Sequence, residues 1–237
     1  MSAARAALTA YLLVFSVGLA ACGDESGDTS APADSGEVQP TGVYEYSTAG
    51  SEQIGGPLPG RHRYVARSTV KVDLSGCELT ERWDARPARW AEWRYCITGD
   101  TWRLQSVTDH HEFFGQIEEY DYRCSGRRVP RPAQIKEGFR WTDRCRASRV
   151  AVVARGEVVS IGPLAVARQR VDAVRLRVRA AFSERVTGGY VMDSWLRRAD
   201  GLLLRRTFES ETRVRSAIGT VPARERYNLR IRSLTPR

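Results

Sequence analysis

The stretch Val174-Arg175-Leu176-Arg177-Val178-Arg179 alternates an apolar residue with an arginine over six positions. Successive side chains of a β-strand point to opposite faces, so this period of two predicts a strand with an apolar inner face and an arginine outer face. The stretch Tyr227-Asn228-Leu229-Arg230-Ile231-Arg232 has the same pattern near the end of the chain. Both stretches therefore predict antiparallel strands that are buried on one side and hydrated on the other.

Further strand-like segments occupy most of the chain, and turn residues separate them. The segments are residues 43–47, 64–74, 90–97, 102–108, 117–122, 150–154 and 191–197, and the expected turns are Gly99-Asp100, Ser125-Gly126, Gly162-Pro163, Gly188-Gly189 and Asp200-Gly201. No convincing amphipathic helix interrupts this pattern. The sequence predicts an all-β fold for residues 42–237, built as an antiparallel curved sheet, a half-open barrel or a sandwich.

The N-terminus has the pattern of an export signal. An apolar run over residues 6–21 follows Arg5 and is shorter than the roughly 18 to 20 apolar residues that a spanning helix needs. The run ends in Leu19-Ala20-Ala21-Cys22, which resembles the lipobox of bacterial lipoprotein signal peptides. That resemblance implies a signal helix over residues 1–21, cleavage before Cys22 and diacylglycerol on its sulfur. The alternative is an ordinary secretory signal that leaves Cys22 as a spare thiol.

Residues 22–41 have the composition of a flexible tether. They include five acids among Gly, Ser, Thr, Ala and Pro, and they contain no Trp, Tyr, Phe, Leu or Ile. Such a segment cannot bury enough apolar surface to offset the entropy lost on ordering. We therefore expect a lipid-anchored Cys22 and a disordered leash in front of an extracytoplasmic β domain, on the outer face of the cell membrane.

The predicted domain is strongly basic. Arg5 and the five tether acids precede it, so it has 36 bases and 23 acids, a formal charge of +13. An exported domain rarely meets nucleic acid, which leaves anionic lipid head groups or wall polymers as the expected partners. Only Lys71 and Lys136 are lysines, however, and a GC-rich genome produces such an arginine bias without selection for binding.

Four cysteines besides Cys22 form an even set, which predicts two disulfides in an oxidising compartment. Three connectivities are possible. A turn at Asp84-Ala85-Arg86-Pro87 would place Trp83 opposite Trp90 and Cys77 opposite Cys96 on one sheet face, which favours Cys77–Cys96 and, by elimination, Cys124–Cys145. The spacing does not suit zinc, and no Cys-x-x-Cys is present.

Two resemblances concern the domain. Residues 158–206, with a Trp195...Asp200-Gly201-Leu202 phrase, resemble the curved sheets of LolA- and LppX-like envelope lipoproteins, in which a half-open barrel shelters acyl chains. The arginine-rich composition, the lipobox and the ending Ser233-Leu234-Thr235-Pro236-Arg237 resemble uncharacterised actinobacterial lipoproteins. The first resemblance implies lipid carriage, whereas the second implies a location and no activity.

Histidines, aromatic residues and arginines supply the candidate site residues of the domain. His110 and His111 suggest a metal or acid–base site, but adjacent strand residues point apart, so a structural loop over residues 109–115 is the preferred interpretation. Hydrolase and phosphate-binding motifs are missing, and no metal or cofactor is expected. The crowded aromatic residues are interpreted either as the lining of a pocket or as core. The candidate binding residues are Trp83, Trp90, Trp93, Trp102, His110, His111, Phe113, Phe114, Arg175, Arg177 and Arg179.

The sequence thus predicts a non-catalytic envelope lipoprotein whose β domain binds a lipid or amphiphile. One alternative is a basic interaction module whose arginine face docks on anionic wall polymer or a partner protein. The other is a histidine-dependent enzyme at His110 and His111.

Overall fold

The computed structural model describes residues 38–55, 59–216 and 219–237. The predicted signal peptide, Cys22 and tether residues 23–37 lie outside these ranges. The described residues form strands and turns and contain no α-helix, which confirms the all-β prediction.

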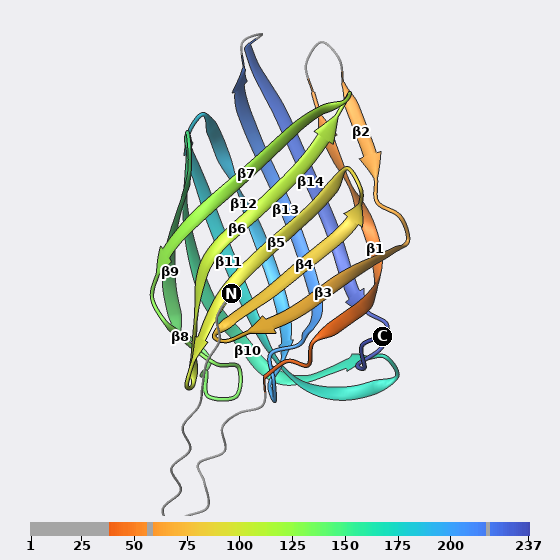
Figure 1. Cartoon of the computed structure of the whole chain (residues 1–237), viewed down its shortest axis with the longest axis vertical. Helices are drawn as coiled ribbons and strands as arrows, with labels where there is room; N and C mark the ends of the chain where they lie inside the picture. The colour runs from red at the N-terminus through yellow and green to blue at the C-terminus, as the bar shows by residue number, and fades with distance from the viewer. Residues whose placement is uncertain (1–37, 56–58, 217–218) are drawn as a thin grey trace, which may run out of the picture. The chain divides into compact units, whose positions relative to one another are not determined.

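The strands follow one another through mostly short connections (Figure 1). They are β1 (Gly42–Ile54), β2 (Gly60–Arg63), β3 (Arg67–Ser75), β4 (Glu78–Arg86), β5 (Arg89–Thr98), β6 (Thr101–Phe113), β7 (Gln116–Gly126), β8 (Val129–Pro130), β9 (Arg140–Ala147), β10 (Val150–Val166), β11 (Gln169–Glu184), β12 (Val186–Arg197), β13 (Leu203–Ser216) and β14 (Gly219–Ile231). All of their pairings are antiparallel.

The sheet closes on itself because β1 has neighbours on both edges. One edge pairs with β3 over residues 42–47 and then with β2 over residues 51–54, and the other edge pairs with β14 over residues 46–54. The result is a closed barrel of twelve strands, with β2 and β8 as additional short strands (Figure 1). The expected curved antiparallel sheet is confirmed. The sheet closes completely, whereas the expected barrel was half-open.

The alternation of apolar and polar residues along each strand decides which side chains point into the barrel. Val174 and Leu229 are fully buried, and Leu176 and Tyr227 are nearly so, whereas Arg175 and Arg230 of the same strands lie on the outside. The inward side chains form two apolar clusters. The larger is built around Trp83, Tyr46 and residues 202–204, and the smaller around Val150, Val152 and Tyr122.

The two predicted disulfides are confirmed. Cys77 bonds to Cys96, and Cys124 bonds to Cys145, which lies directly opposite it on neighbouring strands. The second bond therefore links the adjacent strands β7 and β9, whereas the first ties the turn between β3 and β4 to β5, where Cys96 lies opposite Glu78 rather than opposite Cys77 as predicted.

The predicted register of the β4–β5 hairpin is wrong by one residue. Trp83 lies opposite Ala91, and Trp90 lies opposite Asp84, because the register shifts between Asp84 and Arg86. A one-residue slip moves a side chain to the other face of a sheet. Trp83 is consequently buried in the barrel, while Trp90 lies outside, beneath the Arg82 guanidinium at 3.8 Å.

Several glycine-containing segments that were predicted as turns lie within strands. Residues 125–126, 162–163 and 188–189 continue β7, β10 and β12. Glycine in a strand often marks a close backbone approach, and a Cβ at Gly188 or Gly189 would lie 2.2 Å from a carbonyl oxygen of the neighbouring strand. Turns do occur at Gly99-Asp100 and at Asp200, as predicted.

The predicted loop over residues 109–115 is also wrong. β6 continues to Phe113, and the turn consists of Phe114 and Gly115. Pairing with β5 and β7 on both sides keeps this segment extended, which the polar sequence did not indicate.

Candidate functional site

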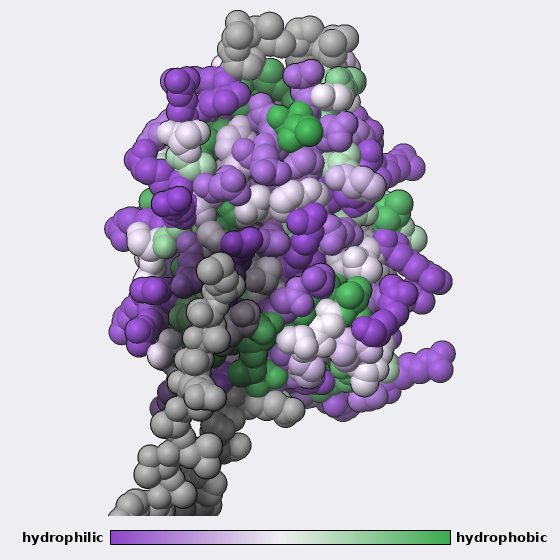
Figure 2. Space-filling view, in the orientation of Figure 1, coloured by the Kyte–Doolittle hydropathy of each residue, from purple (hydrophilic) through white to green (hydrophobic). Residues whose placement is uncertain are grey.

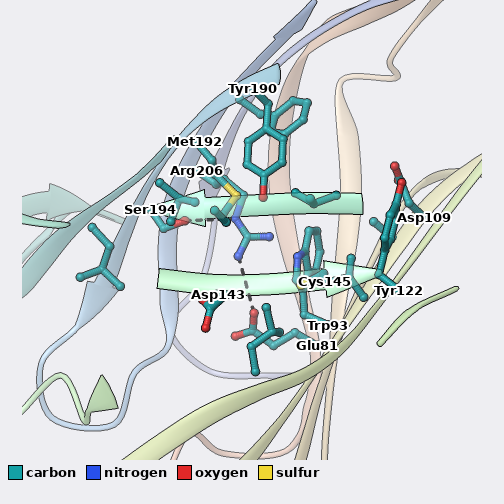
Figure 3. A pocket seen from close by; sticks show the side chains of 18 of the residues that line it. Glu81, Trp93, Asp109, Tyr122, Asp143, Cys145, Tyr190, Met192, Ser194 and Arg206 are labelled. Carbon is teal, nitrogen blue, oxygen red and sulfur yellow. Dashed lines mark hydrogen bonds and ion pairs between the residues drawn. The ribbon is translucent and has the colours of Figure 1, made fainter. Parts of the chain in front are cut away.

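A cavity of about 180 Å³ lies in the interior of the barrel (Figure 3). Inward side chains of β4–β7 and β9–β14 line it, as does Val129 of β8. Most of the lining is apolar or aromatic. Five lining residues carry charge, namely Glu81, Arg89, Asp109, Asp143 and Arg206. The cavity therefore combines a mostly apolar lining with a small number of charged groups, which is the usual composition of a small-molecule site.

Strand β9 supplies three lining residues at alternate positions, Trp141, Asp143 and Cys145. Gly156 on β10 is the register partner of Trp141, and a Cβ at Gly156 would lie 2.1 Å from the indole ring. The missing side chain makes room for the ring to lie flat against the neighbouring strand. Trp141 then donates a hydrogen bond from Nε1 to Asp143 Oδ2 at 3.1 Å.

Arg206 and Glu81 form an ion pair within the cavity. Their charged atoms are 3.6 Å apart, and Arg206 Nε donates to Ser194 Oγ at 3.2 Å (Figure 3). The Arg206 guanidinium also lies 4.4 Å from the centre of the Trp93 ring. Burial raises the pKa of the Glu81 carboxyl more than the Arg206 cation lowers it, so this pKa lies above its ordinary value. The two groups together provide a fixed dipole in the wall.

Asp143 is the lining carboxyl that lacks a cation. In the part of the chain that the structure describes, no ion pair reaches it, and its polar contact is the indole of Trp141. The residue is 7% exposed. Burial raises the pKa of its carboxyl more than the Trp141 hydrogen bond lowers it, and the resulting pKa is about 6. At neutral pH the barrel thus holds one largely ionised carboxylate without a counter-charge.

Arg89 forms a second charged network beside the cavity. Its guanidinium donates to both carboxylate oxygens of Glu225, at 2.9 and 3.1 Å, and pairs with Asp109 at 2.7 Å. His111 lies between Asp109 and Glu52, at 3.2 and 2.8 Å. Because one cation contacts several acids, the network links β1, β5, β6 and β14 across the seam where the barrel closes.

The histidine of this network is held in its charged form. Burial and the Arg89 cation lower its pKa, but Asp109 and the hydrogen bond to Glu52 outweigh them and raise the pKa of His111 to about 9. A protonated imidazole has no free nitrogen lone pair for a metal or for base catalysis. Protonated His111 can donate one hydrogen bond to Asp109 and one to Glu52.

The structure separates the two adjacent histidines, as expected for a strand. His110 lies outside, where it stacks on Trp90 with ring centres 4.9 Å apart and contacts Glu119 at 2.8 Å. Among residues 38–55, 59–216 and 219–237, no group of three or more His, Cys, Asp or Glu side chains is placed to hold a metal ion. The histidine cluster does not form a converging site.

The other candidate residues fall into three places. Trp93 and Trp102 line the cavity, whereas Trp83 is buried in the larger apolar cluster. Phe113 stacks on His62 at 4.3 Å between ring centres, and Phe114 is 61% exposed at its turn.

The arginine stripe lies on the outer surface of the barrel. Arg175 and Arg177 both contact the carboxylate of Asp193, at 2.9 to 3.1 Å, and Arg179 continues the row along the strand. Trp195 lies between the guanidinium groups of Arg175 and Arg205, 5.0 and 4.7 Å from its ring centre. These side chains are on the opposite face from the cavity.

Four charged residues of the cavity wall, Glu81, Arg89, Asp143 and Arg206, were not among the predicted site residues. Two of them have a signal at strand spacing. Asp143 lies two residues from Trp141 and from Cys145, and Glu81 lies between Leu79 and Trp83, so each is a charge on an otherwise apolar face. A buried charge on an apolar face is the informative exception to hydrophobic burial.

No helix among the described residues is long and apolar enough to cross a membrane. The face of the barrel seen in Figure 2 is mostly hydrophilic, with scattered apolar side chains.

Comparison with known proteins gives little further information. No protein-family model matches the chain, and no curated protein matches it. A solved structure of the hypothetical lipoprotein YmcC from Escherichia coli K12 matches with 13% identity and a TM-score of 0.34, over 80% of this chain and 85% of that one. A likeness at this level carries no conclusion about fold or function.

The raised pKa of Asp143 predicts a specific pH dependence of stability. The folded barrel binds the proton of this carboxyl more tightly than the unfolded chain does, so the free energy of unfolding should fall as pH rises from about 4 to about 6. We expect Asp143→Asn to reduce that fall by about 2 kcal/mol. Urea unfolding at pH 4, 5, 6 and 7 measures the free energy of unfolding of the wild-type chain and of Asp143→Asn. Superimposable pH profiles for these two proteins would contradict the prediction.

Proposed function

We propose that this chain is a non-catalytic cell-envelope lipoprotein whose barrel binds a small amphiphile. The observation that supports binding is the cavity of about 180 Å³, with aromatic walls and charged groups that do not fill it. Leu104, Phe182 and Met192 face this cavity and are only half-buried, so their surfaces are available to a ligand.

The size of the cavity restricts the class of ligand. Pockets for drug-sized ligands have volumes of about 300 to 1,000 Å³, whereas an apolar cavity of about 150 Å³ binds benzene. A diacyl lipid is much larger than this space. The proposal therefore favours a single-ring or short-chain amphiphile over the acyl chains that a LolA- or LppX-like carrier would shelter.

The proposed location is supported by the N-terminal sequence and the disulfides. Leu19-Ala20-Ala21-Cys22 resembles a lipobox, and the domain has two disulfides, which form and persist in oxidising compartments. In this proposal Cys22 carries the lipid that holds the barrel at the extracytoplasmic face of the cell membrane. Acylation by more than one chain gives stable anchoring.

A second candidate function has its own observation. Arg175, Trp195, Arg205 and Arg230 are consecutive register partners across β11 to β14 on the outer face. Burial, Arg230 and Arg175 lower the pKa of the Arg205 guanidinium, which shows a local excess of cations. This row could dock on an anionic wall polymer or an acidic partner.

Ligand uptake is tested with benzyl alcohol, a neutral probe of suitable size, by isothermal titration calorimetry on the unlipidated chain. We expect a dissociation constant of about 1 mM or lower. Ala154→Leu should abolish binding because Ala154 lines the cavity, while the outward-facing Ala151→Leu on the same strand should leave it unchanged. Equal binding by both variants would exclude the cavity as the site.

The anchor is tested by cell fractionation of a Cys22→Ala variant. Loss of the acylated sulfur should release the barrel from the membrane fraction, with the wild-type chain retained as the control. Continued membrane retention of the variant would contradict anchoring through Cys22.

The second candidate predicts salt-dependent docking. Co-sedimentation of the unlipidated barrel with purified cell wall should fall as NaCl rises from 0.05 to about 0.5 M, because exposed charge contacts are screened over about 10 Å at 0.1 M. Arg205→Gln with Arg230→Gln should weaken it at low salt. Sedimentation that neither salt nor the double variant changes would remove this candidate.

A further inference from the structure

The cavity has one more negative than positive charge. Glu81 is paired with Arg206, and Asp109 is paired with Arg89, at 3.6 and 2.7 Å. Asp143 is left over, and in the described part of the chain it receives only the neutral indole N–H of Trp141. The residue is more than nine-tenths buried, and Figure 3 shows it among the side chains that line the cavity.

An ionised carboxylate in an apolar interior is costly unless a cation or several donors accompany it. An arginine accompanies each of the other two lining carboxylates, Arg206 beside Glu81 and Arg89 beside Asp109. No side chain in the described ranges does so for Asp143, which lines the cavity. A ligand that brings its own positive charge would therefore complete the set of ion pairs.

The remaining walls suit the same ligand. Trp93, Tyr95, Trp141, Tyr190, Phe208 and Tyr227 present aromatic rings to the cavity. Aromatic faces attract cations, most strongly when water is excluded, and Arg206 already uses the face of Trp93 in this way at 4.4 Å. The rest of the lining is apolar and would contact the hydrocarbon part of the ligand.

We propose that the barrel cavity binds a small organic ammonium ion, with the ammonium group on the Asp143 carboxylate and the hydrocarbon part among the aromatic walls. This inference rests on the proposed function and specifies the ligand class of the same cavity. No covalent step is involved. Below about pH 6 the carboxyl releases one proton as the ion pair forms.

The groups around Asp143 bear on the origin of the pH dependence. Trp141 does not titrate, and Tyr95 and Tyr190 have pKa values raised by burial, so both phenols stay neutral at working pH. Burial also raises the pKa of Glu81, but Glu81 is paired with Arg206 and is unchanged in Asp143→Asn. The part of the pH dependence that Asp143→Asn removes should therefore follow the ionisation of Asp143, with the affinity for an ammonium probe rising about tenfold between pH 5 and pH 7.

The test compares benzylamine, which is protonated throughout this range, with the nearly isosteric benzyl alcohol. Calorimetry at pH 7 should show benzylammonium binding at least tenfold more tightly to the wild-type chain. In Asp143→Asn we expect this preference and this part of the pH dependence to disappear while benzyl alcohol binding changes less than threefold. The matched control is Asp172→Asn, whose side chain is 61% exposed and does not line the cavity.

Each outcome decides a different statement. Equal affinities in the wild-type chain, a preference for the alcohol, or an ammonium preference that survives in Asp143→Asn would overturn the ammonium site while leaving a neutral-ligand cavity. Binding of neither probe would instead overturn the proposed function. Thermal unfolding of Asp143→Asn at pH 5 and 7 verifies that the variant is folded.

Discussion

The hydrogen bonding of β1 to β14 is the constraint on which the rest of the structure depends. Closure makes every alternate side chain of twelve strands an interior residue. About eight strands enclose a space that side chains just fill, and sixteen or more leave an aqueous channel. Twelve strands lie between these limits, so two apolar clusters fill much of this barrel and a cavity remains.

Charges inside a closed barrel have to be matched, because burying an unpaired charge away from water is costly. Arg89 meets this need at the seam, where it contacts Glu225 and Asp109 and indirectly orders His111. Arg206 meets it in the cavity wall beside Glu81. Asp143 remains as the exception, and a ligand site is the physical reason that we propose for keeping an unmatched carboxylate.

Periodicity predicted the strand class and the inward faces around Leu176 and Leu229, whereas both disulfides were predicted from the even cysteine count, an expected turn and elimination. It could not predict closure, since the pairing of β1 with β14 joins segments about 180 residues apart in sequence. The β4–β5 register failed because a one-residue irregularity near Asp84 is not visible in composition. The candidate site was only partly predicted: Trp93 and Trp102 line the cavity, but Asp143 had no motif and becomes noticeable only once its face is known to be interior.

In this proposal Asp143 is a buried, unmatched carboxylate that an ammonium ligand neutralises. Its side-chain carboxyl carbon, labelled with ¹³C, reports the ionisation directly in an NMR pH titration. The account predicts a midpoint near 6 for the free barrel, and a midpoint lower by at least one pH unit with saturating benzylammonium. A midpoint near the ordinary aspartate value of about 3.9, unchanged by the ligand, would contradict it.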